Sequence, residues 1–385
     1  MTDRLDLLYS DTEDDLRAAV RALLADRAGH TVLLDRIETD TPYVPGLWTS
    51  LATGIGAAGL LVPEKLGGQG ASHREAAVVL EELGRAVTPL PYLTSAVVAA
   101  ETLLALAAES APAAELLAAV AGGGTVAVLA VPLSTAPDAD PPHAPSVAAV
   151  ADATAADVLL VPRADGLYAV PAGEATVEPQ TPLDLTRPLA RVTAEPGTGT
   201  RLAGPDASRA AVRRGLLAGA GLLASEQLGL AERCLEDTVR YTRERHQFNR
   251  PVGSFQALKH RMAQLWLDVV GARAAARAAA DALARGAEDA PLTVAVAQAY
   301  CSKVAVRAAE ECVQLHGGIG MTWEHPAHLA LKRAKADQLA FGSAGRHQDA
   351  IAALADLPAP AGTGAGPHAT PVRARAPRAH RPPLG

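Results

Sequence analysis

Residues 243–253 read RERHQFNRPVG and interrupt a long alanine- and leucine-rich stretch. They combine three arginines, Arg243, Arg245 and Arg250, with a histidine, a Phe248 that we expect to be buried, and a closing Pro-Val-Gly turn. So much positive charge at the end of a helix has two explanations. The charge is solvated, with an arginine facing the negative end of the helix dipole, or it meets a bound anion.

A second stretch, residues 312–326, reads CVQLHGGIGMTWEHP. Gly317, Gly318 and Gly320 are expected to end a helix, and glycine lets a ligand approach the backbone because it has no Cβ. Gln314 offers both a hydrogen-bond donor and an acceptor. Taken alone, such a loop is also explained as an ordinary helix C-cap.

Around these stretches, the chain from Ser208 onward is expected to form four long antiparallel helices, because apolar residues recur at spacings of three and four. One stripe comprises Phe255, Leu258, Met262, Leu265 and Val269, and another comprises Tyr300, Val304, Ala308 and Cys312.

Residues 11–121 are also expected to be mainly helical, with Ser10 or Asp11 as the first cap and a further helix from about Ser72 to Arg85. The sequence pattern changes at Thr125, where short runs rich in β-branched residues alternate with Pro, Asp and Gly turns. These are strand signals.

The sequence therefore predicts an α+β fold that is mostly α. We expect an N-terminal helical domain over residues 1–124, a small central antiparallel β-domain over 125–204, and a C-terminal four-helix bundle over 205–357. The Pro-, Gly- and Arg-rich tail, residues 358–385, is expected to be disordered because it has little apolar surface to bury.

Composition excludes several classes of protein. Hydrophobic residues make up 49% of the 385 residues and charged residues 20%, which is typical of a globular chain. A net charge of −7 with 3% aromatics argues against nucleic-acid binding. The most apolar stretch, residues 96–121, carries three glutamates, which argues against membrane insertion. Cys234, Cys301 and Cys312 have no metal-site spacing, so we expect no metal and a reducing, cytoplasmic location.

Together, the two stretches resemble the acyl-CoA dehydrogenase family. The resemblance rests on Arg245, Gln247 and Phe248 followed by PVGSFQALKHRMA, on QLHGGIG, and on VPEKLGGQG with the later EELG. It covers about residues 5–355. Where the family has glycine after the phenylalanine, this chain has Asn249.

The resemblance implies an FAD cofactor, with both elements reaching across a dimer interface to the neighbouring subunit's FAD. A planar guanidinium matches a pyrophosphate bidentately, which suits Arg245 to that anion. The residues expected to contact FAD are Arg245, Gln247, Phe248, Gln314, Gly317, Gly318 and Ser343.

The implied reaction is α,β-desaturation of an acyl-CoA thioester, in which a carboxylate removes the Cα proton. The family's usual base position holds Phe341, and its alternative position on the first bundle helix holds Gly219. The catalytic base is therefore unknown, with Glu226 and Asp337 as weak candidates. The alternative for both residues is a non-catalytic carboxylate that is either solvated or paired within the helices.

The family's flavin-ring segment also has no clear counterpart here. The corresponding region reads VPLSTAPDADPP, in which only Ser134 and Thr135 could replace its hydroxyls. The half of the cofactor site that this chain would present to its own flavin is thus degraded, whereas the half it would lend to a neighbour is intact.

Three readings stay open. In the first, the chain is a subunit that completes the FAD site of a different, catalytic acyl-CoA dehydrogenase chain. In the second, it is a homo-oligomeric acyl-CoA dehydrogenase with a relocated base. In the third, it is a helical scaffold without cofactor. For both enzymatic readings, the resemblance implies electron-transferring flavoprotein as the electron acceptor.

Overall fold

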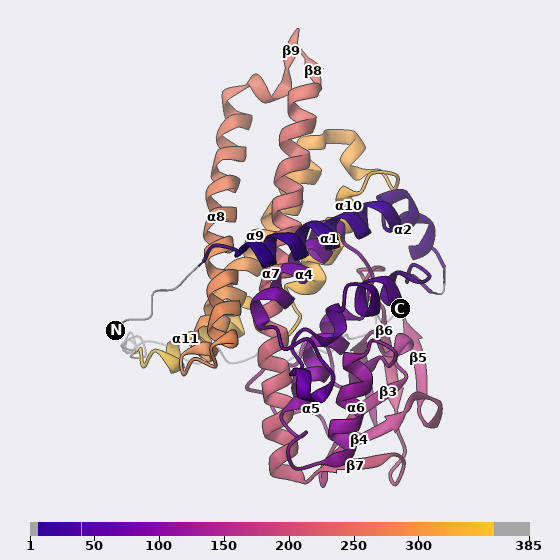
Figure 1. Cartoon of the computed structure of the whole chain (residues 1–385). Coiled ribbons are helices and arrows are strands. Elements are labelled where there is room, and N and C mark those ends of the chain that lie inside the picture. Colours follow the sequence, from indigo (N-terminus) through magenta and orange to yellow (C-terminus); the bar gives the residue numbers. More distant parts are fainter. Residues whose placement is uncertain (1–6, 40, 358–385) are drawn as a thin grey trace, which may run out of the picture.

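The computed structural model describes residues 7–39 and 41–357, and shows long helices beside a smaller β-lobe (Figure 1). The helical, β, helical order gives the α+β, mostly α fold expected from the sequence. The tail predicted to be disordered, residues 358–385, lies outside the described residues. No helix in the described ranges combines the length and apolarity that a membrane span needs.

The N-terminal helices begin where the sequence supplies caps. The Ser10 hydroxyl accepts a hydrogen bond from the Glu13 N–H, and Ser72 forms the same kind of capping box with Glu75. The main helices are α1 (Asp11–Arg27), α2 (His30–Ile37), α4 (His73–Ala86), α5 (Ala100–Leu104) and α6 (Ala111–Ala121). Leu47–Thr49 forms the single-turn α3, and Tyr92–Ala99 is a π-helical segment that leads into α5.

The β-lobe consists of two small sheets. One has the order β1-β3-β4-β7 and the other β2-β6-β5. All pairs in these two sheets are antiparallel except β1 with β3, which the chain joins only after passing through the second sheet. The strands are β1 (Ala127–Leu129), β2 (Ser146–Ala151), β3 (Val158–Arg163), β4 (Gly166–Pro171), β5 (Thr176–Gln180), β6 (Leu189–Thr193) and β7 (Thr200–Ala203).

The C-terminal helices differ from the expected four in one respect. Three are long, namely α7 (Pro205–Glu244), α8 (Gln256–Ala284) and α9 (Ala290–His316). The expected fourth helix is instead two 11-residue helices, α10 (Ala327–Asp337) and α11 (Ala344–Leu354). The break contains Phe341 at φ +53° and Gly342 at φ +102°, conformations that cannot continue a right-handed helix.

Helix α4 crosses α7 at very close range because glycine stands at the crossing on both sides. A Cβ added to Gly84 would lie 2.0 Å from the Glu226 carbonyl oxygen, and one added to Gly229 would lie 1.9 Å from the Glu81 carbonyl oxygen. Neither position accommodates any other residue without separating the helices. This contact fixes the N-terminal helices against the long axis of the bundle.

Candidate functional site

A short hairpin connects α7 to α8 and projects from one end of the molecule (Figure 1). Its strands are β8 (His246–Gln247) and β9 (Arg250–Pro251), paired in antiparallel register. The two turn residues, Phe248 and Asn249, have φ values of +53° and +62°, as a type I′ turn requires. Asparagine tolerates this conformation better than most residues, so Asn249 keeps the turn at a position where the family has glycine.

Phe248 is 88% exposed at the tip of this hairpin, so the expectation that it is buried is wrong for the single chain. Its ring meets only the edge of Phe255, at a centroid distance of 6.1 Å. Sequence alone suggested burial because phenylalanine usually lies inside. A projecting, exposed aromatic side chain is a common anchor at interfaces between subunits.

Arg245 terminates α7 as its C-cap residue, with its N–H donating to the Tyr241 carbonyl. Its carbonyl accepts a hydrogen bond from the Val252 N–H at 2.8 Å, which ties it to the hairpin. Its side chain is exposed and makes no ion pair or hydrogen bond within residues 7–39 and 41–357. Arg250, in contrast, lies over the Phe255 ring at 3.8 Å. The backbone of Arg245 is therefore held in place, while its guanidinium charge has no partner within the described residues.

The glycine loop begins where α9 ends. Gly317 has φ +65°, a value that favours glycine, and its N–H donates to the Gln314 carbonyl. A Cβ added to Gly317 or Gly318 would meet nothing within 4 Å, so both face open space. Gln314 is exposed beside them. Helices α7 and α9 both run antiparallel to α8, so the hairpin and the glycine loop lie at the same end of the bundle.

The two positions where the family could place a base contact each other. The Phe341 side chain is 3% exposed, and its Cζ lies 2.9 Å from the place where a Cβ of Gly219 would be. The Phe341 N–H donates to the Leu133 carbonyl at 2.8 Å. The cavity beside this ring measures about 20 Å³, whereas small-molecule sites usually occupy a few hundred.

The segment expected to replace the flavin-ring hydroxyls is engaged elsewhere. The Thr135 hydroxyl donates to the Pro132 carbonyl at 2.7 Å, and Ser134 is exposed. Asp138 pairs with Arg346 at 2.6 Å, which holds the segment against α11. The structure therefore directs neither hydroxyl into the cavity beside the aromatic ring.

Ser343 is placed apart from the other residues expected to contact FAD. It is the N-cap of α11, and its hydroxyl accepts a hydrogen bond from the Arg346 N–H at 3.3 Å. In Figure 1, α11 lies far from the β8–β9 hairpin. The structure thus groups six of the seven predicted cofactor residues at one end and places Ser343 away from them, two residues after Phe341.

Glu226 and Asp337, the weak candidates for the base, meet in a buried network. The Glu226 carboxylate pairs with Arg187 and Arg333, each at 2.5 Å, and these charges outweigh the effect of burial and lower its pKa. Burial, reinforced by the negative charge of Glu226, raises the pKa of Asp337 to about 8. Asp184 also pairs with Arg333, at 2.5 Å. This arrangement is that of a structural ion-pair cluster.

Sequence reasoning missed the arginines of this cluster. Arg187 lies 39 residues from Glu226 in the sequence, and Arg333 lies 107 residues from it. No local spacing therefore predicts either ion pair. Arg333 is one of several charged residues in α10, so the helix pattern gave no signal that this one is buried. Burial of a charged residue requires such partners.

The two halves of the expected cofactor site fit FAD differently. At the half expected for the chain's own flavin, the Phe341 ring packs against Gly219 and the adjoining cavity measures about 20 Å³. At the half that the chain would lend, Arg245 supplies an unpaired guanidinium and Gly317 an open backbone. Only the second half suits an anionic cofactor.

Two family models match this chain. Residues 10–124 match the family model described as acyl-CoA dehydrogenase, N-terminal domain, and residues 209–355 match the one described as acyl-CoA dehydrogenase, C-terminal domain. Acyl-CoA dehydrogenase IpdE2 of Mycobacterium tuberculosis is 38% identical over 328 residues, which cover 83% of this chain and 89% of that protein.

Solved structures show the same fold. The ChsE4–ChsE5 complex of Mycobacterium tuberculosis contains a chain that superimposes with a TM-score of 0.79 at 26% identity, covering 92% of this chain and all of that one. A variant of the Tcur3481–Tcur3483 steroid ACAD gives a TM-score of 0.77 at 26% identity, with coverage of 90% and 98%. On the family matches and the 38% identity over most of its length, the chain belongs to the acyl-CoA dehydrogenase family.

Proposed function

We propose that this chain is a subunit of a heteromeric acyl-CoA dehydrogenase and completes the FAD site of a catalytic partner chain. The observation that carries the proposal is the Phe341 ring packed on Gly219, which fills both places for a base in this chain. Desaturation of a thioester requires a carboxylate against Cα. The partner chain would supply it.

Arg245, the hairpin and the glycine loop are the parts that this chain would contribute. Arg245 would hold the pyrophosphate of FAD as a bidentate, permanently charged donor. Gly317 and Gly318 would let the cofactor approach the backbone, with Gln314 as an additional hydrogen-bonding group. When bound, FAD accepts the hydride that leaves Cβ of the acyl group.

An exposed apolar surface supports the assembly. Trp266 and Leu267 on α8 are each 56% exposed, and Tyr300 on α9 is 40% exposed. Large apolar side chains of this kind on neighbouring helices usually mark a protein interface. The ChsE4–ChsE5 and Tcur3481–Tcur3483 structures are each named for two proteins, and the second is described as a steroid ACAD. These names favour a heteromer that acts on a bulky acyl-CoA, with electron-transferring flavoprotein as acceptor.

Co-expression tests the proposal. The chain would be produced alone and together with a family member that carries glutamate before Gly-Thr at the usual base position. We expect flavin absorbance and acyl-CoA-dependent dye reduction only in the co-purified complex. Flavin and turnover in the chain alone would instead favour a homo-oligomeric enzyme. A stable complex in which no site at the interface holds flavin would favour a scaffold.

A further inference from the structure

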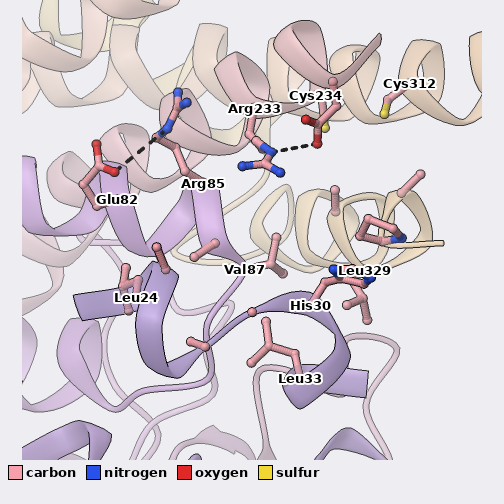
Figure 2. A pocket seen from close by; sticks show the side chains of 18 of the residues that line it. Leu24, His30, Leu33, Glu82, Arg85, Val87, Arg233, Cys234, Cys312 and Leu329 are labelled. Atoms are coloured by element: carbon pink, nitrogen blue, oxygen red, sulfur yellow. Dashed lines mark hydrogen bonds and ion pairs between the residues drawn. The ribbon is translucent and has the colours of Figure 1, made fainter. Parts of the chain in front are cut away.

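A second, larger cleft lies away from the cavity beside Phe341. It measures about 310 Å³ and is bounded by α1, α2, α4, α7, α9 and α10 (Figure 2). It shares no lining residue with the cavity beside Phe341. One wall is apolar, with Leu24, Leu33 and Leu329, and the other carries Arg85 and Arg233.

The positive charges of Arg85 and Arg233 are already paired with carboxylates of the same chain. The Arg85 guanidinium contacts Glu232 at 3.2 Å and Glu236 at 2.5 Å, and the Arg233 Nε pairs with Asp237 at 2.7 Å. The cleft therefore has no strong net attraction for an anion. A small ligand of low charge, or one that reacts chemically with the wall, fits it better.

Two cysteines provide reactive groups in that wall. Cys234 on α7 and Cys312 on α9 both line the cleft, and they are 2% and 3% exposed (Figure 2). The Cys312 sulfur lies 3.6 Å from Nδ1 of His316, one helical turn further along α9. The same nitrogen lies 2.6 Å from the Cys312 carbonyl oxygen, which can only accept a hydrogen bond. Nδ1 of His316 therefore carries a proton beside the sulfur.

Aromatic rings hold His316 in this position. The imidazole stacks on Tyr241 at a centroid distance of 4.4 Å and contacts the tilted ring of His325 at 4.5 Å. His325 also lines the cleft. The imidazole therefore cannot rotate away from the sulfur without losing both ring contacts.

Electrostatics favours the thiolate at Cys312. A hydrogen bond from the Cys234 thiol outweighs burial and, together with His316, lowers the pKa of Cys312 to about 5. The same hydrogen bond, followed by burial, raises the pKa of Cys234 well above its usual value. Burial acts to lower the pKa of His316, but its hydrogen bonds to Cys312 prevail and raise it. The other charged groups nearby are Arg233 and Asp237 of α7.

We propose that Cys312 is a modification site that reacts with small hydroperoxides entering the cleft, and that Cys234 resolves the product into a disulfide between α7 and α9. The geometry supplies a nucleophilic sulfur, an adjacent proton donor, a second thiol and access for a small molecule. The inference is independent of the role proposed for Arg245 and the glycine loop.

The chemistry balances in two steps. The Cys312 thiolate attacks one peroxide oxygen, the O–O bond breaks, and the leaving oxygen takes a proton and departs as water or an alcohol. This leaves a sulfenic acid on Cys312. The Cys234 sulfur then attacks the Cys312 sulfur, the S–O bond breaks, and water leaves with the Cys234 proton. Two thiols lose two electrons and the peroxide gains them.

Cys301 is the internal control. It is 1% exposed, its thiol donates to the Ala272 carbonyl at 3.4 Å, and it does not line the cleft. Burial raises the pKa of Cys301 to about 12. An inert, buried thiol of this kind should not react under conditions that modify a cleft thiolate.

Peptide mapping of the full-length chain after brief treatment with dilute hydrogen peroxide tests the proposal. We expect a Cys234–Cys312 disulfide in the unmodified chain and in Cys301→Ser. Cys234→Ser should stop at a sulfenic acid that dimedone traps on Cys312, and Cys312→Ser should give neither product. Oxidation of Cys301 at the same rate, or a Cys312 that stays reduced in the unmodified chain, would overturn the proposal without reliance on any variant.

His316 is tested as a positioning residue. The rate at which iodoacetamide alkylates Cys312 would be followed against pH in the unmodified chain and in His316→Gln, with melting curves to verify folding. At about pH 6.5, two units below the ordinary thiol pKa of about 8.5, we expect the variant to react roughly tenfold more slowly. Identical pH profiles would show that the histidine does not stabilise the thiolate.

Discussion

Phe341 and Gly219 are in direct van der Waals contact, so the two positions where the family resemblance would place a base adjoin each other. The ring Cζ lies 2.9 Å from the place of a Gly219 Cβ, and a Val98 methyl lies 2.7 Å from it. Real Cβ atoms do not approach carbon this closely, so either residue constrains the other. The contact therefore leaves no room for a larger side chain at position 219.

The first prediction concerns this contact. Gly219→Ala should destabilise the fold by about 1–3 kcal/mol through overpacking, partly offset by about 1 kcal/mol of better helix propensity. Phe341→Leu should relieve the clash, so the double variant should lose less than the sum of the single losses. Denaturant titration would give the free energy of unfolding of the two single variants and of the double variant. Gly124→Ala, where a Cβ would meet nothing within 4 Å, is the matched control. Additive losses would contradict the contact.

The second prediction concerns catalysis. The purified chain should not reduce dye with any acyl-CoA in a panel, and Phe341→Glu should not restore activity. The reason is that a carboxylate at this position would face an apolar cavity of about 20 Å³ without room for substrate. Phe341→Gln separates the effect of charge from that of shape. Robust turnover by the unmodified chain would instead favour a homo-oligomeric enzyme.

The third prediction concerns Arg245 in the co-purified complex. Arg245→Ala should strip flavin, and Arg245→Lys should weaken its retention because an ammonium ion lacks the bidentate fork. Loss of one charge-assisted hydrogen-bonding group costs about 1.5–3 kcal/mol, on the order of 10- to 100-fold in affinity. Flavin absorbance after gel filtration measures retention. Arg243→Ala, on another face of the same helix end, should leave it unchanged, and full retention in Arg245→Ala contradicts the prediction.

The fourth prediction concerns the buried network. Burial raises the pKa of Asp337 to about 8, against about 4 in an unfolded chain. Between these values the folded state binds a proton that the unfolded state has released, so this residue's contribution to stability falls as pH rises from about 4 to about 8. Asp337→Asn mimics the protonated form, and its advantage in melting temperature should therefore grow over this interval.

Glu226→Gln provides the opposite case for the same experiment. Its carboxylate pairs with Arg187 and Arg333, each at 2.5 Å, so neutralising it leaves two buried cations with less compensation. Breaking a buried pair typically costs about 3–5 kcal/mol. A gain in stability for Glu226→Gln, or a pH-independent effect of Asp337→Asn, would show that the protonation states are assigned wrongly.

Local chemistry explains which features could be predicted from the sequence. Ser10 and Ser72 indicate where α1 and α4 begin, because a hydroxyl followed three residues later by glutamate forms a capping box. From Thr125 onward, short runs rich in β-branched residues alternate with turn residues. This local pattern is typical of strands and predicted the β-lobe. The fold class followed from such signals in chain order.

Features that depend on distant partners could not be predicted. The break between α10 and α11 depends on a left-handed Phe341, a conformation that is rare for a bulky residue and that the surrounding contacts impose. The parallel pairing of β1 with β3 depends on how two sheets stack. Cys234 and Cys312 line one cleft from two different helices, and cysteine spacing along the chain does not predict that they share it.

The 40-residue helix α7 has a further consequence for how this protein can change over evolutionary time. It is about 60 Å long at 1.5 Å per residue, and it carries Gly219, Glu226 and Cys234 on one unbroken spiral, with Arg245 as its C-cap. Because each residue turns the helix by about 100°, one inserted or deleted residue would swing every later side chain to another face. The spacing along the helix therefore fixes the relative directions of these positions, and it offers the register by which distant relatives should be aligned.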